Sequence, residues 1–225
     1  MINRYLRYII FFCFVFTFFI KKCFTQDAHS NLISILESNY PVEFTFQQKY
    51  QNQMLQGWMV IYGNGMARTE FAPPNNNLII ADGKWILFHD PTIDRTTYIP
   101  LDKGILGAFL DPKSFSKDKF FKVKEERKNA EIVFTLDLNI NNKNQKIILY
   151  FEEKSKNLLG WKLYESKIDF IDVKVMVLKK FNISDDYNLK DFFNINKANS
   201  DIRKLYFGPY KNRKVKKYLG SGKSN

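Results

Sequence analysis

The chain of 225 residues has little of what most enzymes and metal proteins need. Its two cysteines, Cys13 and Cys23, lie near the N-terminus, so the remainder has neither a disulfide framework nor a cysteine zinc site. Two histidines, His29 and His89, are too few for a site built from several histidine ligands. The sequence contains no G-x-S-x-G and no H-E-x-x-H motif. We therefore expect no catalytic residues, no metal site, no cofactor and no enzymatic activity.

The central part of the chain also lacks an excess of charge. The formal net charge is +12, but residues 1–25 carry four basic and no acidic side chains, and residues 203–225 carry eight basic and no acidic ones. Residues 26–202 are neutral. A nucleic-acid-binding domain carries its basic excess on the folded surface. The distribution therefore argues against a nucleic-acid partner and places the basic residues in a tail.

A long apolar run occurs once, at the N-terminus. Residues 9–20 (IIFFCFVFTFFI) follow Arg4 and Arg7. A basic stretch before a short apolar run is typical of a signal peptide, and the run is short for a membrane span. Lys21 and Lys22 stand where small residues usually precede cleavage, so an uncleaved anchor is the alternative. We interpret residues 1–25 as an export signal.

The spacing of apolar residues predicts a mainly β domain over residues 26–202. One helix comes first, with apolar residues between 32 and 36, Ser30 as its N-cap and Pro41 as its end. From residue 42 the apolar period changes to two, which is typical of antiparallel strands with one covered face. Turn signals separate the runs that we expect to be strands: 42–47, 54–62, 66–72, 77–81, 84–89, 96–101, 119–126, 131–138, 145–152, 158–165 and 168–180.

Several of these runs are apolar on both faces. In residues 54–62, Trp58 and Val60 share one face, while Met59 lies on the other. Residues 84–89 alternate in the same way. Two interpretations are open: a sheet that is covered on both sides, or a sheet with one face lining an apolar cavity.

A series of short motifs occurs in a recognisable order. In chain order these are F-T-F-Q at 44–47, Q-G-W at 56–58, R-T-E-F-A-P-P at 68–74, L-I-I-A-D-G-K-W at 78–85, D-P at 90–91, Y-I-P-L at 98–101 and the apolar stretch G-I-L-G-A-F-L at 104–110. Their order and spacing resemble the LolA family, the periplasmic carriers that move lipoproteins from the inner to the outer membrane of Gram-negative bacteria. Beyond residue 119 the resemblance rests on strand rhythm, G-W-K-L at 160–163 and D-F-F at 191–193.

The resemblance implies an open, incomplete antiparallel β-barrel of roughly eleven strands, with helices as a lid over an apolar cavity for acyl chains. Mapped onto this sequence, the residues expected to line the cavity are Trp58, Val60, Met66, Phe71, Ile80, Trp85 and Leu87. Those expected in the lid are Ile105, Leu106, Phe109 and Leu110.

One departure from the family concerns how the lid is held. Many members have a basic residue followed by proline just before the turn at residue 64, and that arginine helps to hold the lid closed. This chain has Tyr62 and Gly63 at those positions. Arg68 is the nearest substitute, and we expect it to hold the lid instead.

The function implied by the resemblance is that of a monomeric periplasmic carrier. Its partners would be lipoproteins, an ABC transporter complex that releases them from the inner membrane, and an outer-membrane acceptor or an anionic membrane surface. The basic tail, residues 203–225, would contact that surface through Lys211, Arg213, Lys214, Lys216 and Lys217, or would simply be a solvated extension. Two other classes remain open: a lipid- or lipoprotein-sensing module of the same fold, soluble or anchored, and a secreted hydrolase.

Overall fold

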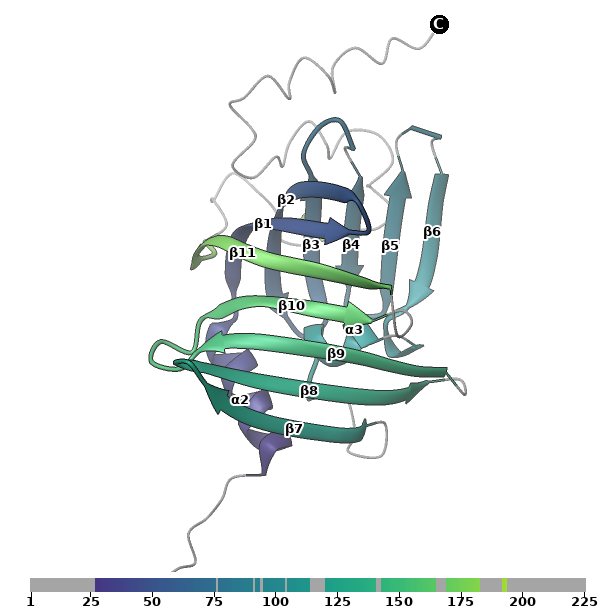
Figure 1. The fold of residues 1–225 in the computed structure, drawn as a ribbon. Helices are drawn as coiled ribbons and strands as arrows, with labels where there is room; N and C mark the ends of the chain where they lie inside the picture. Colours follow the sequence, from purple (N-terminus) through teal and green to yellow (C-terminus); the bar gives the residue numbers. More distant parts are fainter. Residues whose placement is uncertain are drawn as a thin grey trace, which may run out of the picture.

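A single antiparallel sheet with short helices forms the described part of the chain in the computed structural model (Figure 1). The helices are α2 (Ala28–Asn39), the 3-10 turn η1 (Leu101–Lys103) and α3 (Ile105–Leu110). The strands are β1 Val42–Tyr50, β2 Gln53–Gly63, β3 Met66–Phe71, β4 Leu78–Asp82, β5 Trp85–Asp90, β6 Arg95–Pro100, β7 Phe120–Lys128, β8 Glu131–Ile140, β9 Lys143–Glu152, β10 Leu158–Tyr164 and β11 Phe170–Lys180. The structure describes residues 27–75, 77–90, 92–93, 95–103, 105–113, 120–140, 143–164, 169–182 and 192–193.

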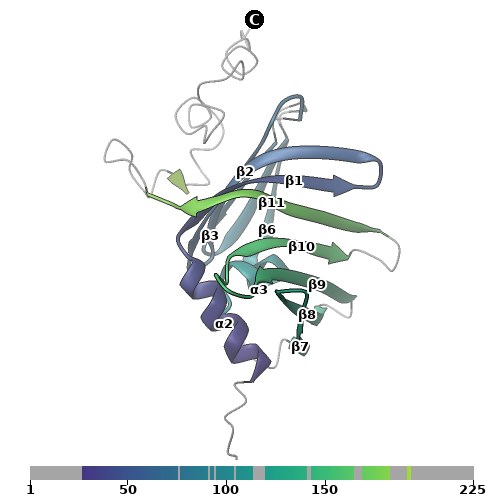
Figure 2. The same ribbon diagram turned by 60° about the vertical axis from the view of Figure 1, so that its left-hand side comes forward.

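The sheet consists of two meanders joined through the strands nearest the chain ends. Its order is β6-β5-β4-β3-β2-β1-β11-β10-β9-β8-β7. The pairing of β1 with β11 brings residues 42–50 against residues 171–180. Strands β3–β6 run across the direction of β7–β11, so the sheet curls and its two halves face each other (Figures 1 and 2). Strands β6 and β7 do not pair with each other, so the barrel is open.

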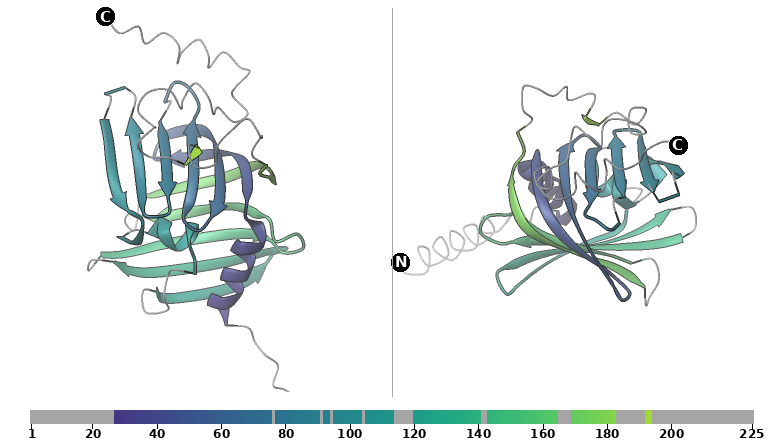
Figure 3. Two further views of the ribbon diagram at one scale, coloured as in Figure 1. Left: turned by 180° about the vertical axis from the view of Figure 1, so that it is seen from behind. Right: turned by 90° about the horizontal axis from the view of Figure 1, so that it is seen from above.

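Alternation along the strands divides the sheet into two faces. The inner face carries Phe46, Met59, Ala67 and Ala81, and the outer face carries the residues between them, such as Val60. The inner face forms the main core, together with the apolar sides of α2 and α3. Seen from behind, α2 crosses one half of the sheet and α3 lies between the two halves (Figure 3).

A second layer of packing covers the outer face of β2 and β3. Trp58 and Val60 pack there with Phe181, Phe192 and Phe193 from the C-terminal part of the chain. The two-faced apolar pattern of β2 therefore has two causes, because one face borders the main core and the other is covered by these phenylalanines.

The expected fold class is confirmed: the protein is mainly β, with a sheet that does not close and few helices. Residues 104–110, expected to be a short helix or a loop, contain the helix α3. The N-cap at Ser30 was wrong, because α2 begins at Ala28 and its N-cap position is Asp27, three residues before Ser30. The interpretations of residues 1–25 and 203–225 lie outside the described residues. None of the helices that the structure describes is long and apolar enough to cross a membrane.

Candidate ligand-binding pocket

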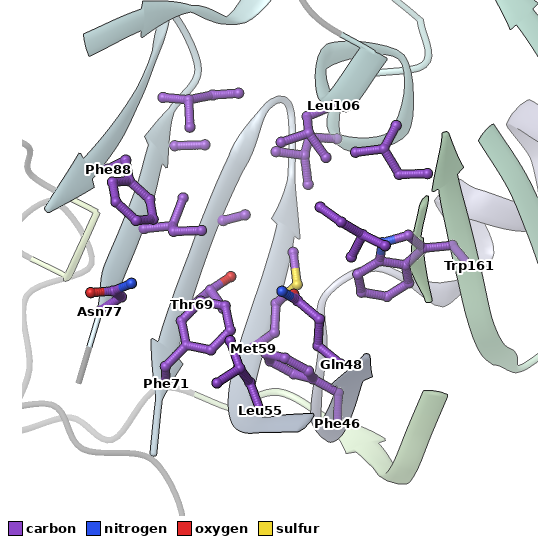
Figure 4. A pocket seen from close by; sticks show the side chains of 17 residues that line it. Phe46, Gln48, Leu55, Met59, Thr69, Phe71, Asn77, Phe88, Leu106 and Trp161 are labelled. Carbon is purple, nitrogen blue, oxygen red and sulfur yellow. The ribbon is translucent and has the colours of Figure 1, made fainter. Parts of the chain in front are cut away.

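An apolar pocket lies between the inner face of the sheet and α3 (Figure 4). Its volume is about 310 Å³, at the lower end of the range for pockets that bind small molecules. Both halves of the sheet and α3 line it, through Phe46, Gln48, Leu55, Met59, Ala67, Thr69, Phe71, Asn77, Ile79, Ala81, Ile86, Phe88, Leu106, Leu110, Trp161, Leu163 and Ile171.

The lining has almost no polar chemistry. Gln48, Thr69 and Asn77 are its polar members, and no lining side chain is charged. Burying a charged group here would be costly, because no opposite charge in the lining would compensate it. The described part of the chain also contains no group of three or more His, Cys, Asp or Glu residues that could hold a metal ion. The pocket therefore suits an uncharged apolar ligand.

Aromatic rings fix the shape of the pocket wall. Phe46 and Phe71 meet edge to face, with ring centroids 5.6 Å apart. Trp161 stacks at a tilt on Phe109 of α3 at 5.3 Å and meets Phe44 edge-on at 6.1 Å. Such pairs stabilise one arrangement of rings beyond simple burial. The ring contacts therefore fix the arrangement of the aromatic part of the wall.

Helix α3 closes one end of the pocket with aliphatic side chains. Leu106 and Leu110 line the cavity, whereas Ile105 and Phe109 are buried in the main core. The helix has six residues (ILGAFL) and no charged side chain. All four residues expected in the lid therefore lie on a helix beside the pocket.

The C-terminal end of α3 is held by two hydrogen bonds to its carbonyl groups. The hydroxyl of Tyr40 donates to the carbonyl of Phe109 at 2.7 Å, and the backbone N–H of Gly65 donates to the carbonyl of Leu110 at 3.0 Å. The last carbonyls of a helix have no partner within the helix, so these bonds satisfy them. Burial and the nearby Asp111 carboxylate raise the pKa of Tyr40 well above its ordinary value, which keeps the donor protonated.

Tyr40 packs beside Gly63, where the backbone conformation favours glycine. A side chain on residue 63 would meet the Tyr40 ring at 3.6 Å, and the residue has a left-handed φ of 102°. The sequence analysis missed Tyr40, which lies before the first strand. The signal that was available is the Tyr62-Gly63 pair, which departs from the pattern expected from the resemblance.

The structure corrects most of the residues assigned to the cavity from the sequence. Phe71 lines the pocket. The outer face instead holds the other residues, because strand alternation places them opposite the lining residues: Trp58, Val60, Met66, Ile80, Trp85 and Leu87. The residues that sequence reasoning missed are their immediate neighbours, including Met59, Ile79, Ile86 and Phe88.

Arg68 does not face α3, so its assignment to holding the lid was also wrong. It pairs in register with Val60 and Ile80, which share its outer face. Its side chain is fully buried, and its Nε donates to the Glu70 carboxylate at 2.7 Å. Its Nη1 donates to the carbonyl of Phe192 at 3.2 Å, and the guanidinium lies 5.2 Å from the centre of that ring. Arg68 therefore links Phe192 to the outer face of the sheet.

The tail residues expected at a membrane lie outside the described residues. They are Lys211, Arg213, Lys214, Lys216 and Lys217. Contact between these residues and a membrane remains a prediction.

The combination of an open antiparallel sheet, an apolar inner pocket and a covering helix fits the resemblance seen in the sequence. The pattern of the family described as "Outer membrane lipoprotein carrier protein LolA" matches residues 39–202. The chain belongs to the LolA family. Two similar proteins, each named outer-membrane lipoprotein carrier protein, come from Legionella pneumophila strains Corby and Paris. Each is 28% identical over 170 residues, covering 72% of this chain and 83% of the relative.

Two solved structures align with this chain at low sequence identity. An uncharacterised conserved protein from Thermus thermophilus aligns with a TM-score of 0.47 and 14% identity, over 74% of this chain and 93% of that one. A LolA superfamily protein from Nitrosomonas europaea aligns with a TM-score of 0.37 and 11% identity, over 69% of this chain and 96% of that one.

Proposed function

We propose that this LolA family protein is a non-enzymatic carrier that binds the acyl chains of lipoproteins in the pocket beneath α3. The observation that carries the proposal is the lining itself: seventeen residues without one charged side chain, closed by the aliphatic side chains of a six-residue helix. The names of the Legionella relatives support the same cargo.

The energetics suit acyl chains. Burying a methylene stabilises a complex by roughly 0.8 kcal/mol, so one sixteen-carbon chain contributes about 12 kcal/mol if fully buried. The polar groups of the lining cannot compete with that magnitude. A carrier must nevertheless release its cargo, and Leu106 and Leu110 cover part of the same apolar wall. Because the cargo must displace them, the net affinity is lower than burial alone would give.

The proposal includes a route for the cargo, which the family and the sequence support. The protein is exported to the periplasm by residues 1–25 and works there as a monomer without a cofactor. It receives lipoproteins from an inner-membrane ABC transporter complex and delivers them to an outer-membrane acceptor or an anionic membrane surface. The apolar N-terminal run and the basic residues of the tail support this route.

A pair of variants, one inside the pocket and one outside it, tests the proposal. Ile79 lines the pocket and is half-buried, so Ile79→Glu places a carboxylate against the ligand. Val177 is 61% exposed on β11, so Val177→Glu is the matched control. We expect Ile79→Glu to weaken binding of a palmitoylated peptide at least a hundredfold, a loss of about 2.7 kcal/mol. Val177→Glu should bind like the parent protein. Equal affinities for both variants in a fluorescence titration would contradict the proposal.

A further inference from the structure

The two free edges of the sheet differ in chemistry. From residue 122 to residue 128, β7 has the sequence K-V-K-E-E-R-K, and its charges pair within the strand and with Glu153, just after β9. Helix α2 also packs against β7, where the Asn31 side chain donates to Glu125 at 2.7 Å. Charged side chains and covering elements protect an edge strand from pairing with other chains. The β7 edge is therefore protected from pairing with another chain.

The β6 edge is less protected in the described residues, with a single charged side chain and with Pro100 at the end of the strand. Arg95 is its charged residue, at the start of the strand. Tyr98 and Ile99 are 51% and 44% exposed, and Ile93, just before the strand, is 63% exposed. β6 is the outermost strand of its half, and no described element lies on the side away from β5 (Figures 1 and 3). An exposed apolar edge of this kind is a template for pairing with an extended chain.

The β6 edge is continuous with the pocket wall. Ile99 lies opposite Ile86 in the register of β5 and β6, and Thr97 lies opposite Phe88. Ile86 and Phe88 both line the pocket. Paired residues of antiparallel strands point to the same face, so Ile99 extends the apolar wall as far as the edge. A ligand that fills the pocket therefore has an apolar path out past β6.

We propose that β6 binds the extended polypeptide that follows the acylated end of a cargo lipoprotein, which adds as a further strand at this edge. The inference rests on the proposed function, because the acyl chains must occupy the pocket first. Strand addition uses main-chain hydrogen bonds, so it depends little on the sequence of the added strand. That property suits a carrier whose cargoes share a lipid anchor but differ in sequence. Ile99 and Tyr98 supply the apolar contacts beside those bonds.

Amide hydrogen exchange with three probes tests this proposal on the full-length protein. The probes are a palmitoylated peptide, the same peptide without the acyl chain, and palmitate alone. The indole signal of Trp161 reports occupation of the pocket. We expect the palmitoylated peptide and palmitate each to shift the indole signal of Trp161. Of the three probes, only the palmitoylated peptide should slow exchange of the β6 amides. Unchanged β6 exchange with a shifted Trp161 would overturn strand addition and leave the pocket function standing. An unchanged Trp161 signal with both the palmitoylated peptide and palmitate would overturn strand addition and the pocket function together.

Two proline variants add a test that does not depend on exchange rates. Adjacent residues of an edge strand direct their N–H groups alternately toward the sheet and away from it. Of the two variants Thr97→Pro and Tyr98→Pro, one therefore removes an N–H that bonds to β5, and the other removes an N–H that points away from the sheet. The second variant keeps the hydrogen bonds between β5 and β6, so it is the one with the higher thermal stability. We expect that variant to bind the palmitoylated peptide about tenfold more weakly and palmitate unchanged. Parent-like affinity of that variant for the palmitoylated peptide would overturn the proposal. Slow exchange of the β6 amides without peptide, at high protein concentration only, would overturn it too, because it would indicate pairing between two copies of the chain.

Discussion

Removing the Tyr40 hydroxyl should loosen α3 and tighten ligand binding. Tyr40→Phe keeps the ring over Gly63 and deletes one hydrogen bond, the 2.7 Å bond to the carbonyl of Phe109. Leaving a buried carbonyl without its donor costs about 1–3 kcal/mol, which shifts the equilibrium between closed and open α3 by roughly 5- to 150-fold. The apparent affinity of a ligand that needs the open form rises with the population of that form. We expect a gain of about tenfold in affinity for a palmitoylated peptide.

The assay is a titration of parent and variant proteins with the palmitoylated peptide, together with thermal unfolding. The variant should bind more tightly while it unfolds at a lower temperature, a combination that simple damage to the fold does not produce. Tyr62→Phe is the matched control, since it makes the same chemical change on the outer face, where Tyr62 packs beside Phe193. Unchanged or weaker binding by Tyr40→Phe would refute the idea that this bond holds α3 over the pocket.

The pH dependence gives the same prediction a second check. The raised pKa of Tyr40 means that the folded state binds the hydroxyl proton more tightly than the unfolded state does. Its contribution is therefore fully present below the unfolded value, near 10, and is lost as the pH rises above it. Ligand affinity of the parent protein should be constant between about pH 6 and 9 as far as Tyr40 is concerned. A pH-dependent change in the ratio of the ligand affinities of the parent and Tyr40→Phe within that range would contradict a protonated Tyr40 hydroxyl as the donor to α3.

Two further predictions concern the back of the sheet and the tail. Arg68→Met should destabilise the fold by about 3–5 kcal/mol, because it removes the cation that pairs with the buried Glu70 carboxylate. Denaturant unfolding measures the free energy of unfolding, and the double variant Arg68→Met with Glu70→Met should recover most of the lost stability. An Arg68→Met protein as stable as the parent would contradict the pairing of Arg68 with Glu70. Deleting residues 204–225 should weaken binding to anionic vesicles at least tenfold at low salt and hardly at high salt, since basic residues each contribute about 1 kcal/mol near such a surface. Equal binding at low salt would leave the tail without this role.

Local patterns in the sequence were sufficient to predict strands but not to predict which face they turn to the pocket. In β1 the alternation of apolar and polar residues predicted one covered face, and Phe44 and Phe46 on that face are buried in the main core. In β2 both faces are apolar, and period two cannot distinguish them. The outer face of β2 is covered by Phe192 and Phe193, more than a hundred residues away in the chain. The local sequence of β2 does not indicate that these residues pack against it.

Two hydrogen-bonding residues show the same limit. Arg68 and Glu70 are two residues apart on one strand, so they share a face, but the contact of Arg68 with Phe192 could not be read from that spacing. Tyr40 reaches the carbonyl of Phe109 across 69 residues of sequence. The family motifs located the expected lid at residues 104–110, whereas the residue that holds α3 in this chain became visible only in three dimensions.

The central claim is that acyl chains bind on the inner face of the sheet, beneath α3. The most direct test is an isotope-filtered NOE measurement between the methylene protons of a bound palmitoylated peptide and methyl groups of the protein. The account predicts contacts to Met59, Ile79 and Leu106, which line the pocket. Contacts instead to Val60 and Ile80, on the outer face, would contradict it.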